Sequence, residues 1–349
     1  MAKKLIVRWN EGQEQKRVEQ VMRQELALTP HQIRSAKFRE EGIRIDGSQV
    51  RINAYLHPGE VLEVLLEPER RSLAEAAAGC AGGCRQGRED SGGAGSVEAG
   101  LPEAVPGLLD ILYEDEDLIV LNKPAGLVVH PAHGHYKDTL ANYLTFYFSE
   151  RGKNTVIRPI GRLDKDTSGA VLFARNQVAA ARLWSDFQNQ EQRLGAHKEY
   201  LALVWGSFLE SGGSIEEPLE RCQDELNRMR VSQTGQYAKT NYQMLQKFET
   251  DAGIISLVRL TLETGRTHQI RVHMAYTGHP LLGDPIYGDG RLDANGSLKM
   301  TRAALHCHRM RLRQPFNGKW IQAEAPLPED MGRLLTGADE SWTAVRADR

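Results

Sequence analysis

A short charged run at residues 161–169 holds the side chains whose types and spacing best suit chemistry. Arg162, Asp164, Lys165 and Asp166 lie close together there, between two mainly apolar stretches. An aspartate in a partly apolar setting with cations beside it stays ionised near neutral pH and is held in one direction. Such a carboxylate can act as a nucleophile or as a general base. The same residue types also form turns, so the chemical interpretation depends on other parts of the chain.

A second polar cluster spans residues 265–273 and follows an apolar stretch that we predict to be a strand. Thr267 is suited to cap a helix that begins here, and Gly278 with Pro280 is suited to end it. On this helix Thr267 and Arg271 share one face, because residues four apart are neighbours on a helix surface.

Two histidines in this cluster, His268 and His273, raise the question of a metal site. They are five residues apart, whereas the histidines of a zinc helix are four apart and accompanied by a glutamate. We therefore interpret both as polar histidines satisfied by hydrogen bonds, and we predict no metal.

Composition sets the broad class. The 349 residues are enough for two or three domains, and 40% hydrophobic with 26% charged residues is typical of a soluble globular protein. The net charge of −2 excludes a uniformly basic protein but not a local basic face. There is no apolar run of the ~20 residues that a membrane helix needs. The four cysteines are too few and scattered for a disulfide framework, so we expect a cytoplasmic protein.

Residues 1–66 are predicted to form a small α/β domain. Short strands and two helices share this segment, and Asp46 with Gly47 is a hairpin turn signal. The predicted elements are strands near 3–9, 43–50 and 59–64 and helices over 17–26 and 29–39.

Two segments have compositions that do not favour a folded core. Residues 67–106 are rich in Gly and Ala, with almost no large apolar residues, and are predicted to be a flexible linker. Cys80 and Cys84 in this linker have no second ligand pair, so a zinc site is not expected. Residues 331–349 are predicted to be a C-terminal tail.

Residues 107–330 are predicted to form the larger domain. Several antiparallel strands with only a few helices between them favour an α+β fold with a mixed, mainly antiparallel sheet flanked by helices. Strands are expected at 111–121, 198–206, 237–248 and 254–262, and helices from 139 onward and at 179–190.

Four motifs, in this order along the chain, resemble the RluA family of pseudouridine synthases. They are Lys123-Pro124 and the segments 162–169, 198–202 and 265–273. The resemblance covers the chain apart from the linker and the last ~20 residues. One departure is Gly161, where many relatives carry histidine.

The N-terminal domain resembles the S4 RNA-binding domain, which presents a basic surface to folded RNA. The matching parts are the second predicted helix, the hairpin at 42–50 and the strand that ends at Val64. The helices carry five basic residues that suit RNA contact: Arg17, Arg23, Arg34, Lys37 and Arg39.

The family resemblance implies a role for each matching site residue. Asp164 corresponds to the catalytic aspartate, Arg271 to the basic residue that pairs with it, and Tyr200 to the aromatic residue that stacks on the uracil. Ile270 would close the pocket under the base, and Arg162 would fill the gap left by the extruded nucleotide.

The expected reaction needs no cofactor. The bond from N1 to C1′ breaks, the uracil rotates, and C5 bonds to C1′, so no atom is gained or lost. The carboxylate can begin by attacking C1′, by adding to C6 or by taking the C2′ proton, and the sequence leaves all three open. Because the nucleotide must be flipped out of the RNA, phosphate contacts are needed. Lys123 and Lys198 are candidates, with Arg162 and Lys165.

The resulting hypothesis is a monomeric RNA pseudouridine synthase that acts on large-subunit ribosomal RNA. A transfer-RNA pseudouridine synthase is the alternative within the same class. A non-catalytic RNA-binding or ribosome-assembly factor with this fold is an alternative of another class, and Asp164 argues against it. A glycosidase would need two carboxylates at a defined separation, which Asp164 and Asp166 on one tight loop do not provide.

Overall fold

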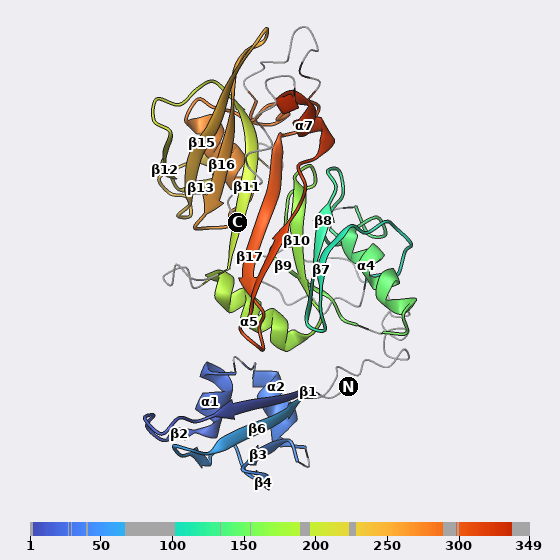
Figure 1. Cartoon of the computed structure of the whole chain (residues 1–349), viewed down its shortest axis with the longest axis vertical. Coiled ribbons are helices and arrows are strands. Elements are labelled where there is room, and N and C mark those ends of the chain that lie inside the picture. Colours follow the sequence, from blue (N-terminus) through green and yellow to red (C-terminus); the bar gives the residue numbers. More distant parts are fainter. Residues whose placement is uncertain are drawn as a thin grey trace, which may run out of the picture. The chain divides into compact units, whose positions relative to one another are not determined.

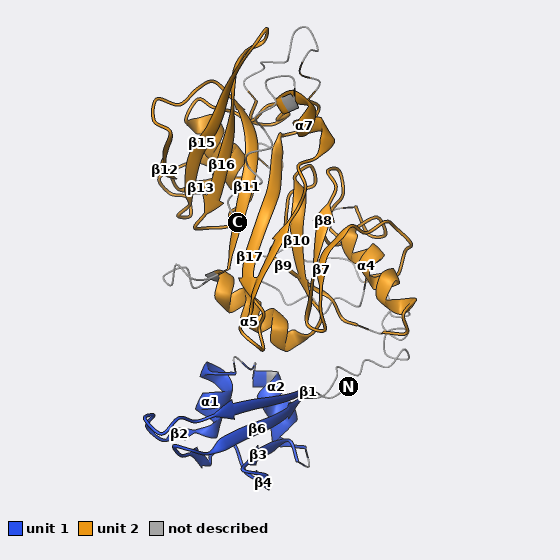
Figure 2. Ribbon diagram, viewed as in Figure 1, with its two compact units in different colours: residues 1–101 blue, residues 102–349 orange. Residues whose placement is uncertain are grey.

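The computed structural model describes most of the chain as two compact units, residues 1–101 and 102–349 (Figure 2). The described residues are 3–26, 28, 30–39, 41–66, 102–132, 134–153, 155–188, 196–222, 228–288, 298 and 300–336. Most of the predicted linker, including Cys80 and Cys84, lies outside them. No helix within these ranges is long and apolar enough to cross a membrane.

The first unit contains an antiparallel sheet in the order β1-β6-β3-β4 and two helices. The sheet strands are β1 (Lys3–Arg8), β3 (Ile43–Ile45), β4 (Ser48–Gln49) and β6 (Val61–Leu66). The helices are α1 (Val18–Gln24) and α2 (Pro30–Lys37), and β2 (Lys16–Arg17) pairs with β5 (Tyr55–Leu56). The predicted hairpin turn is present, because Asp46 and Gly47 both have positive φ values, 47° and 79°.

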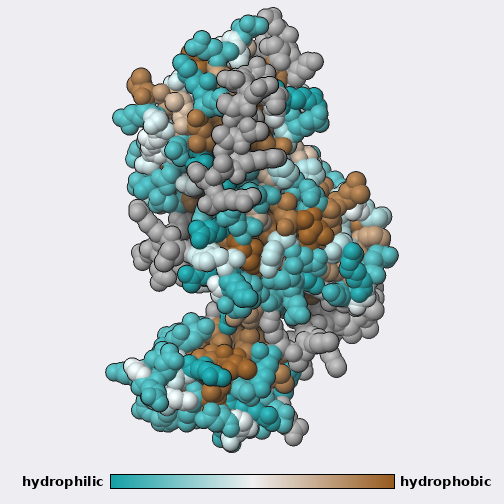
Figure 3. All heavy atoms as spheres, viewed as in Figure 1, coloured by the Kyte–Doolittle hydropathy of each residue, from teal (hydrophilic) through white to brown (hydrophobic). Residues whose placement is uncertain are grey.

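The core of this unit is formed by apolar residues of α1 and β6. Val18, Val21 and Met22 of α1 are fully buried, as are Leu62 and Val64 of β6. These alternating and helically spaced apolar residues bring the sheet and helices together. In the face drawn in Figure 3, apolar residues gather over the sheet of this unit, and the larger unit also shows apolar patches among hydrophilic residues.

The second unit is built on one large sheet in the order β12-β15-β16-β11-β17-β10-β8-β7 (Figure 1). β9 (Arg158–Ile160) pairs with β10, and β18 (Trp320–Glu324) pairs with β17. The pairing of β10 with β17 is parallel and the others are antiparallel, so the predicted mixed, mainly antiparallel sheet is confirmed. Along the sheet the strands are β12 (Gly212–Glu216), β15 (Lys239–Thr250), β16 (Gly253–Leu262), β11 (His197–Trp205), β17 (Leu305–Arg313), β10 (Ser168–Ala174), β8 (Leu118–Lys123) and β7 (Ile111–Glu114).

Helices flank this sheet, with α4 beside β7 and β8 in Figure 1. They are α4 (Leu140–Ser149), α5 (Gln177–Gln188), α6 (Gln269–Tyr276) and α7 (Glu329–Thr336). A small hairpin, β13 (Leu219–Arg221) with β14 (Met229–Val231), contacts α6. These helices match the predicted ones within a few residues, except α7.

The predicted boundary at residue 330 is wrong, because α7 is part of the second unit. Met331 and Leu335 of α7 are buried in one apolar cluster with Leu201, Leu203 and Trp205 of β11. Met331 and Leu335 are four residues apart and therefore lie on one face of the helix, and their burial stabilises α7 as part of the folded unit. The sequence alone did not show which sheet residues would receive these side chains.

Close packing in the middle of the sheet requires a glycine. All residues of β10 are buried, and Gly169 pairs in parallel with Cys307 of β17. A Cβ on Gly169 would lie 2.2 Å from the carbonyl oxygen of Cys307. Glycine is therefore needed for β10 and β17 to lie this close. This contact places the start of β10, and the charged loop before it, against the centre of the sheet.

Candidate active site

The charged loop that contains Asp164 joins β9 to β10. Leu163 before it and Thr167 after it are buried, and the backbone N–H of Thr167 donates to the carbonyl oxygen of Asp164 at 3.1 Å. The Asp164 side chain is 27% exposed. Its neighbours are thus fixed in the core while the carboxylate itself reaches solvent, which suits a group that meets a substrate.

Gly161 begins this loop with a φ of +75°, in the left-handed region that favours glycine. A Cβ there would also lie 3.0 Å from Nζ of Lys198. The absence of a histidine at this position therefore has a local backbone reason in this chain. Lys198 itself lies beside the loop, with Nζ 5.4 Å from the centre of the Phe187 ring. Burial lowers the pKa of Lys198, and its phosphate contact stays a prediction.

Lys123 supports the loop from within the protein. Its side chain is fully buried, and Nζ donates to the carbonyl oxygens of Pro124, Leu127 and Lys165 at 2.9, 2.7 and 2.8 Å. Burial lowers its pKa to about 7. An ammonium enclosed by three carbonyls cannot reach RNA, so this geometry contradicts the predicted phosphate contact. Lys123 instead joins the end of β8 to the charged loop.

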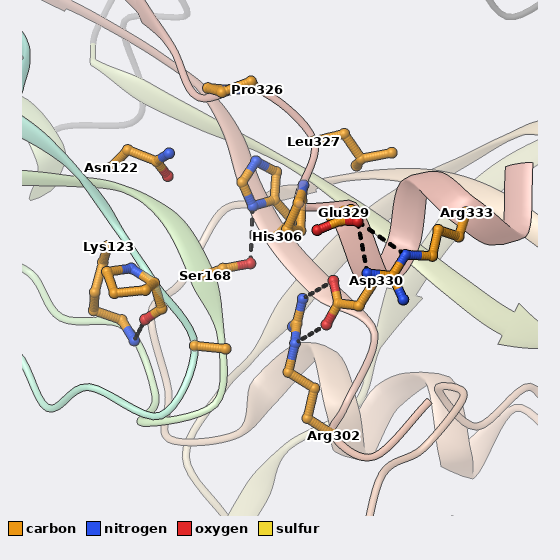
Figure 4. Close-up of a pocket in the computed structure, with 13 residues that line it drawn as sticks. Asn122, Lys123, Ser168, Arg302, His306, Pro326, Leu327, Glu329, Asp330 and Arg333 are labelled. Atoms are coloured by element: carbon orange, nitrogen blue, oxygen red, sulfur yellow. Dashed lines mark hydrogen bonds and ion pairs between the residues drawn. The ribbon is translucent and has the colours of Figure 1, made fainter. Parts of the chain in front are cut away.

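A cavity of about 430 Å³ lies next to Lys123 and has walls that also support the loop (Figure 4). Ser168 and His306 meet there, with Oγ 2.9 Å from Nδ1. Burial lowers the pKa of His306 to about 4, so the ring is neutral at pH 7. Its Nδ1 accepts a hydrogen bond from the Ser168 hydroxyl, and its Nε2–H donates to the carbonyl oxygen of Ala325 at 3.2 Å. We assign this tautomer from the carbonyl partner.

Arg302 joins the same loop to α7. Its Nη1 donates to the carbonyl oxygen of Asp166 at 3.1 Å, and its Nε and Nη2 donate to the two carboxylate oxygens of Asp330 at 2.6 and 2.9 Å (Figure 4). Arg302 was not among the predicted site residues. No local signal indicates it, because its partners lie 28 and 136 positions away.

Arg271 lies between two carboxylates. Its Nη1 is 3.7 Å from Oδ2 of Asp164, whereas its Nε and Nη2 donate to Asp284 at 2.7 Å each. Burial opposes ionisation of Asp284, but hydrogen bonds from Arg271 and from the backbone of Ile286 and Tyr287 keep its pKa below the ordinary value. The predicted contact between Arg271 and Asp164 is present, but the tighter partner of Arg271 is Asp284.

His268 is a further neighbour of Asp164. Its Nε2 lies 3.9 Å from Oδ2 of Asp164, and its Nδ1 lies 2.8 Å from Oη of Tyr287. His268 is also the N-cap residue of α6. The predicted cap, Thr267, instead accepts a hydrogen bond from Nη2 of Arg162 at 3.0 Å. The sequence does not indicate this role for His268, because its contact to Asp164 joins segments 104 positions apart.

His273, by contrast, fits the predicted polar histidine. It is fully buried, with Nδ1 2.9 Å from Oγ1 of Thr240 and Nε2 2.9 Å from the carbonyl oxygen of Glu217. No group of three or more potential metal ligands occurs among the residues that the structure describes.

Apolar and aromatic groups lie beneath the loop. Tyr200, Ile270 and Leu163 belong to one buried cluster, and Tyr200 pairs with Cys307 across β11 and β17. Burial and then the charges of Cys307 and Asp164 raise the pKa of Tyr200 well above its ordinary value, so the phenol is neutral. The fold thus brings together Asp164 from the loop before β10, Tyr200 from β11, and Ile270 and Arg271 from α6.

Comparison with known proteins identifies this arrangement. A family model described as RNA pseudouridylate synthase matches residues 117–276. The chain is 42% identical over 236 residues to YlyB of Bacillus subtilis, described as an uncharacterized RNA pseudouridine synthase, covering 66% of this chain and 73% of that protein. It is 38% identical over 242 residues to ribosomal large subunit pseudouridine synthase D of Escherichia coli K12, covering 67% and 71%.

Two solved human structures agree with these matches. RNA pseudouridylate synthase domain containing 1 has a TM-score of 0.50 at 26% identity, covering 67% of this chain and 96% of that one. RNA pseudouridylate synthase domain containing 4 has a TM-score of 0.52 at 25% identity, covering 65% and 92%. The matched residues include Asp164, Tyr200 and Arg271. The chain belongs to the RNA pseudouridine synthase family, whose members are isomerases that convert uridine in RNA to pseudouridine.

Proposed function

We propose that this protein isomerises uridine in large-subunit ribosomal RNA and that Asp164 is the catalytic carboxylate. The observation that carries the proposal is the partly exposed Asp164 carboxylate beside Arg271, above buried Tyr200 and Ile270. Relatives named ribosomal large subunit pseudouridine synthase D, 38% and 41% identical in two bacteria, support ribosomal RNA as the substrate class.

In this proposal each element of the site has a physical task. The guanidinium of Arg271, 3.7 Å from Oδ2 of Asp164, is a cationic neighbour for the carboxylate that begins all three possible first steps. The Tyr200 ring is a platform for the detached uracil, and base stacking on an aromatic ring is worth roughly 1–3 kcal/mol. Ile270 is 4% exposed and closes the pocket beneath the base.

The proton balance of the reaction is simple. When C5 replaces N1 at C1′, the proton on C5 is lost and N1 of the product gains one, so no external donor or acceptor is consumed overall. Attack at C1′, addition to C6 and removal of the C2′ proton all begin at the same Asp164 carboxylate. The neutral Tyr200 phenol adds no competing charge near it.

Contacts to the surrounding RNA come from the exposed side of the loop. Arg162 is exposed and held by Thr267, in a position to occupy the gap in the RNA stack. Thr267 also lines a second cavity of about 480 Å³, whose walls include Arg221 and Arg266. In the proposal this cavity receives the RNA strand beside the target uridine, because guanidinium groups favour phosphate.

The N-terminal unit supports RNA binding in an S4-like manner. Phe38 at the end of α2 is 77% exposed, and Nζ of Lys37 lies 5.2 Å from its ring centre. Tyr55 is 45% exposed with the guanidinium of Arg17 over its ring. Exposed aromatic rings with cations beside them are typical of surfaces that contact unpaired bases and phosphates.

The test uses purified full-length protein and transcripts of large-subunit ribosomal RNA and transfer RNA. Base-specific chemical mapping should find pseudouridine in the ribosomal transcript. Asp164→Asn should lose the product while it still binds the RNA. Product from the Asn variant would contradict the role of Asp164. If only the transfer RNA is modified, the proposed substrate is wrong and transfer RNA takes its place. If no cellular RNA yields product, the protein binds RNA without modifying it.

A further inference from the structure

His268 holds a position that the reaction scheme above does not use. Asp164 is approached at one oxygen, Oδ2, by both Nη1 of Arg271 at 3.7 Å and Nε2 of His268 at 3.9 Å. Arg271 is already committed to Asp284 through its other nitrogens. One guanidinium therefore serves two carboxylates, and a second donor next to Asp164 has a clear electrostatic use.

The neighbours of His268 determine which nitrogen carries its proton. Oη of Tyr287 accepts the backbone N–H of Met229 at 2.8 Å and lies 2.8 Å from Nδ1 of His268. The phenol proton of Tyr287 then has Nδ1 as its acceptor. We assign the neutral tautomer with hydrogen on Nε2, so that an N–H group points toward Asp164. Burial lowers the pKa of His268, although Asp164 opposes that shift, and the ring is therefore neutral at pH 7.

The backbone of His268 also costs energy. Its φ is +54° and its ψ is 18°, in the left-handed region, which costs an L-residue roughly 1–2 kcal/mol. Such conformations persist where the surrounding structure enforces them, and they concentrate at functional sites. Here the strained residue links the end of the loop after β16 to α6, and its side chain turns toward Asp164 rather than capping the helix.

We propose that His268 is a positioning residue for Asp164. Its Nε2–H and Nη1 of Arg271 hold Oδ2, so Oδ1 is the oxygen that meets the uridine. The inference rests on the proposed function. The separation of 3.9 Å between Nε2 and Oδ2 is longer than a hydrogen bond. We expect this separation to shorten when the substrate binds, because catalytic hydrogen bonds commonly tighten in the substrate complex.

The charges around His268 give this arrangement a pH dependence. The groups that face it are Asp164, Arg271, Asp284, Arg162 and Tyr287. As the pH falls, the imidazole gains a proton and forms a full ion pair with Asp164. That pair makes the carboxylate less reactive. Protonation of His268 therefore lowers the activity on the acid side.

The experiment compares wild type with His268→Phe and His268→Gln in single-turnover assays on ribosomal RNA. The Phe variant should react about 10- to 100-fold more slowly, the range that one hydrogen bond to an ion is worth. RNA binding should be unchanged. The Gln variant should recover part of the rate, because its amide supplies an N–H donor. The acid limb of the pH–rate profile of the Gln variant should move to lower pH, because this variant has no imidazole to titrate.

A matched control is His273→Gln, which changes the other buried histidine of α6. His273 bonds to Thr240 and Glu217 instead of Asp164, so this variant should lose thermal stability without a change in the pH profile. If both His268→Gln and His268→Phe fold and keep the wild-type rate and pH profile, the inference is wrong, while the proposed function is unaffected. If His268→Phe does not fold, the pH profile of His268→Gln decides. An inactive wild type would instead contradict the proposed function.

Discussion

Arg271 holds Asp284 more tightly than it holds Asp164. Two nitrogens of Arg271 donate to Asp284 at 2.7 Å, while its Nη1 stays 3.7 Å from Asp164. Asp284 therefore fixes the guanidinium, and Asp164 remains accessible to substrate beside a cation that cannot fully enclose it. This division of contacts leads to the first of four predictions.

Asp284→Asn should destabilise the protein and slow the reaction. Removing one partner of a buried ion pair costs about 3–5 kcal/mol, so the free energy of unfolding should fall by about that amount. Arg271 should then turn toward Asp164 and shield it. Urea unfolding and single-turnover rates measure the two effects. Glu329→Gln, which changes an exposed pair with Arg333, is the control and should leave both unchanged. A stable, fully active Asp284→Asn would contradict the prediction.

Tyr200→Leu should slow the reaction by about 5- to 150-fold, the kinetic equivalent of losing one stacking contact. Tyr200→Phe should stay close to wild type, because the neutral ring is retained and only the hydroxyl is lost. Rates on the same RNA transcript distinguish the two. Tyr276→Leu is the control, since Tyr276 on α6 is 57% exposed and should not matter. Equal losses in the Leu and Phe variants would show that the hydroxyl, not the ring, is needed.

His306 should make stability depend on pH. Its folded pKa of about 4 lies below its ordinary value of 6.5, so the unfolded chain binds the extra proton between these values. Stability contributed by neutral His306 is fully present above pH 6.5 and is lost as the pH falls toward 4. The loss amounts to about 3 kcal/mol. The difference in unfolding free energy between wild type and His306→Gln, measured across this range, checks it. If the unfolding free energies of wild type and His306→Gln change with pH in parallel, His306 does not cause the pH dependence.

Asp330→Asn should reduce the rate but not RNA binding. The substitution weakens the hold of α7 on Arg302, which donates to the carbonyl oxygen of Asp166 in the loop. The loss of a hydrogen bond of this kind corresponds to about 2- to 10-fold in rate. Single-turnover kinetics and filter binding separate the two quantities. Glu329→Gln, one residue earlier, again provides the control. A lower affinity with an unchanged rate would place Asp330 in RNA binding instead.

Local patterns in the sequence predicted much of the fold. The strands at 111–121 and 254–262 and the helix after Thr139 appear close to where alternation and capping residues indicated them. Thr139 caps α4, because its side chain accepts from the backbone of Asn142. These features depend on neighbours within a few residues, which is why a single sequence reveals them. α7 was missed because its burial depends on β11.

The candidate site divides in the same way. The run at 161–169 offered Asp164 as a candidate, but the same residue types also form turns. Only together with the motifs at 198–202 and 265–273 did the run indicate a catalytic carboxylate. The roles of Lys123, Arg302 and His268 depend on distant partners. Lys123 donates to three carbonyl oxygens, Arg302 to the Asp330 carboxylate on α7, and His268 contacts the Tyr287 hydroxyl.

By itself, the sequence determined which groups are chemically available and which short segments present them. Only the tertiary structure decided which of these groups meet. The Asp164 carboxylate, the Tyr200 ring and the Arg271 guanidinium come from the loop before β10, from β11 and from α6, and they become neighbours only when the sheet forms. Charge and burial act over a few ångströms in space, whatever the separation along the chain. For that reason Lys123, basic in the sequence, serves as an internal support in the fold.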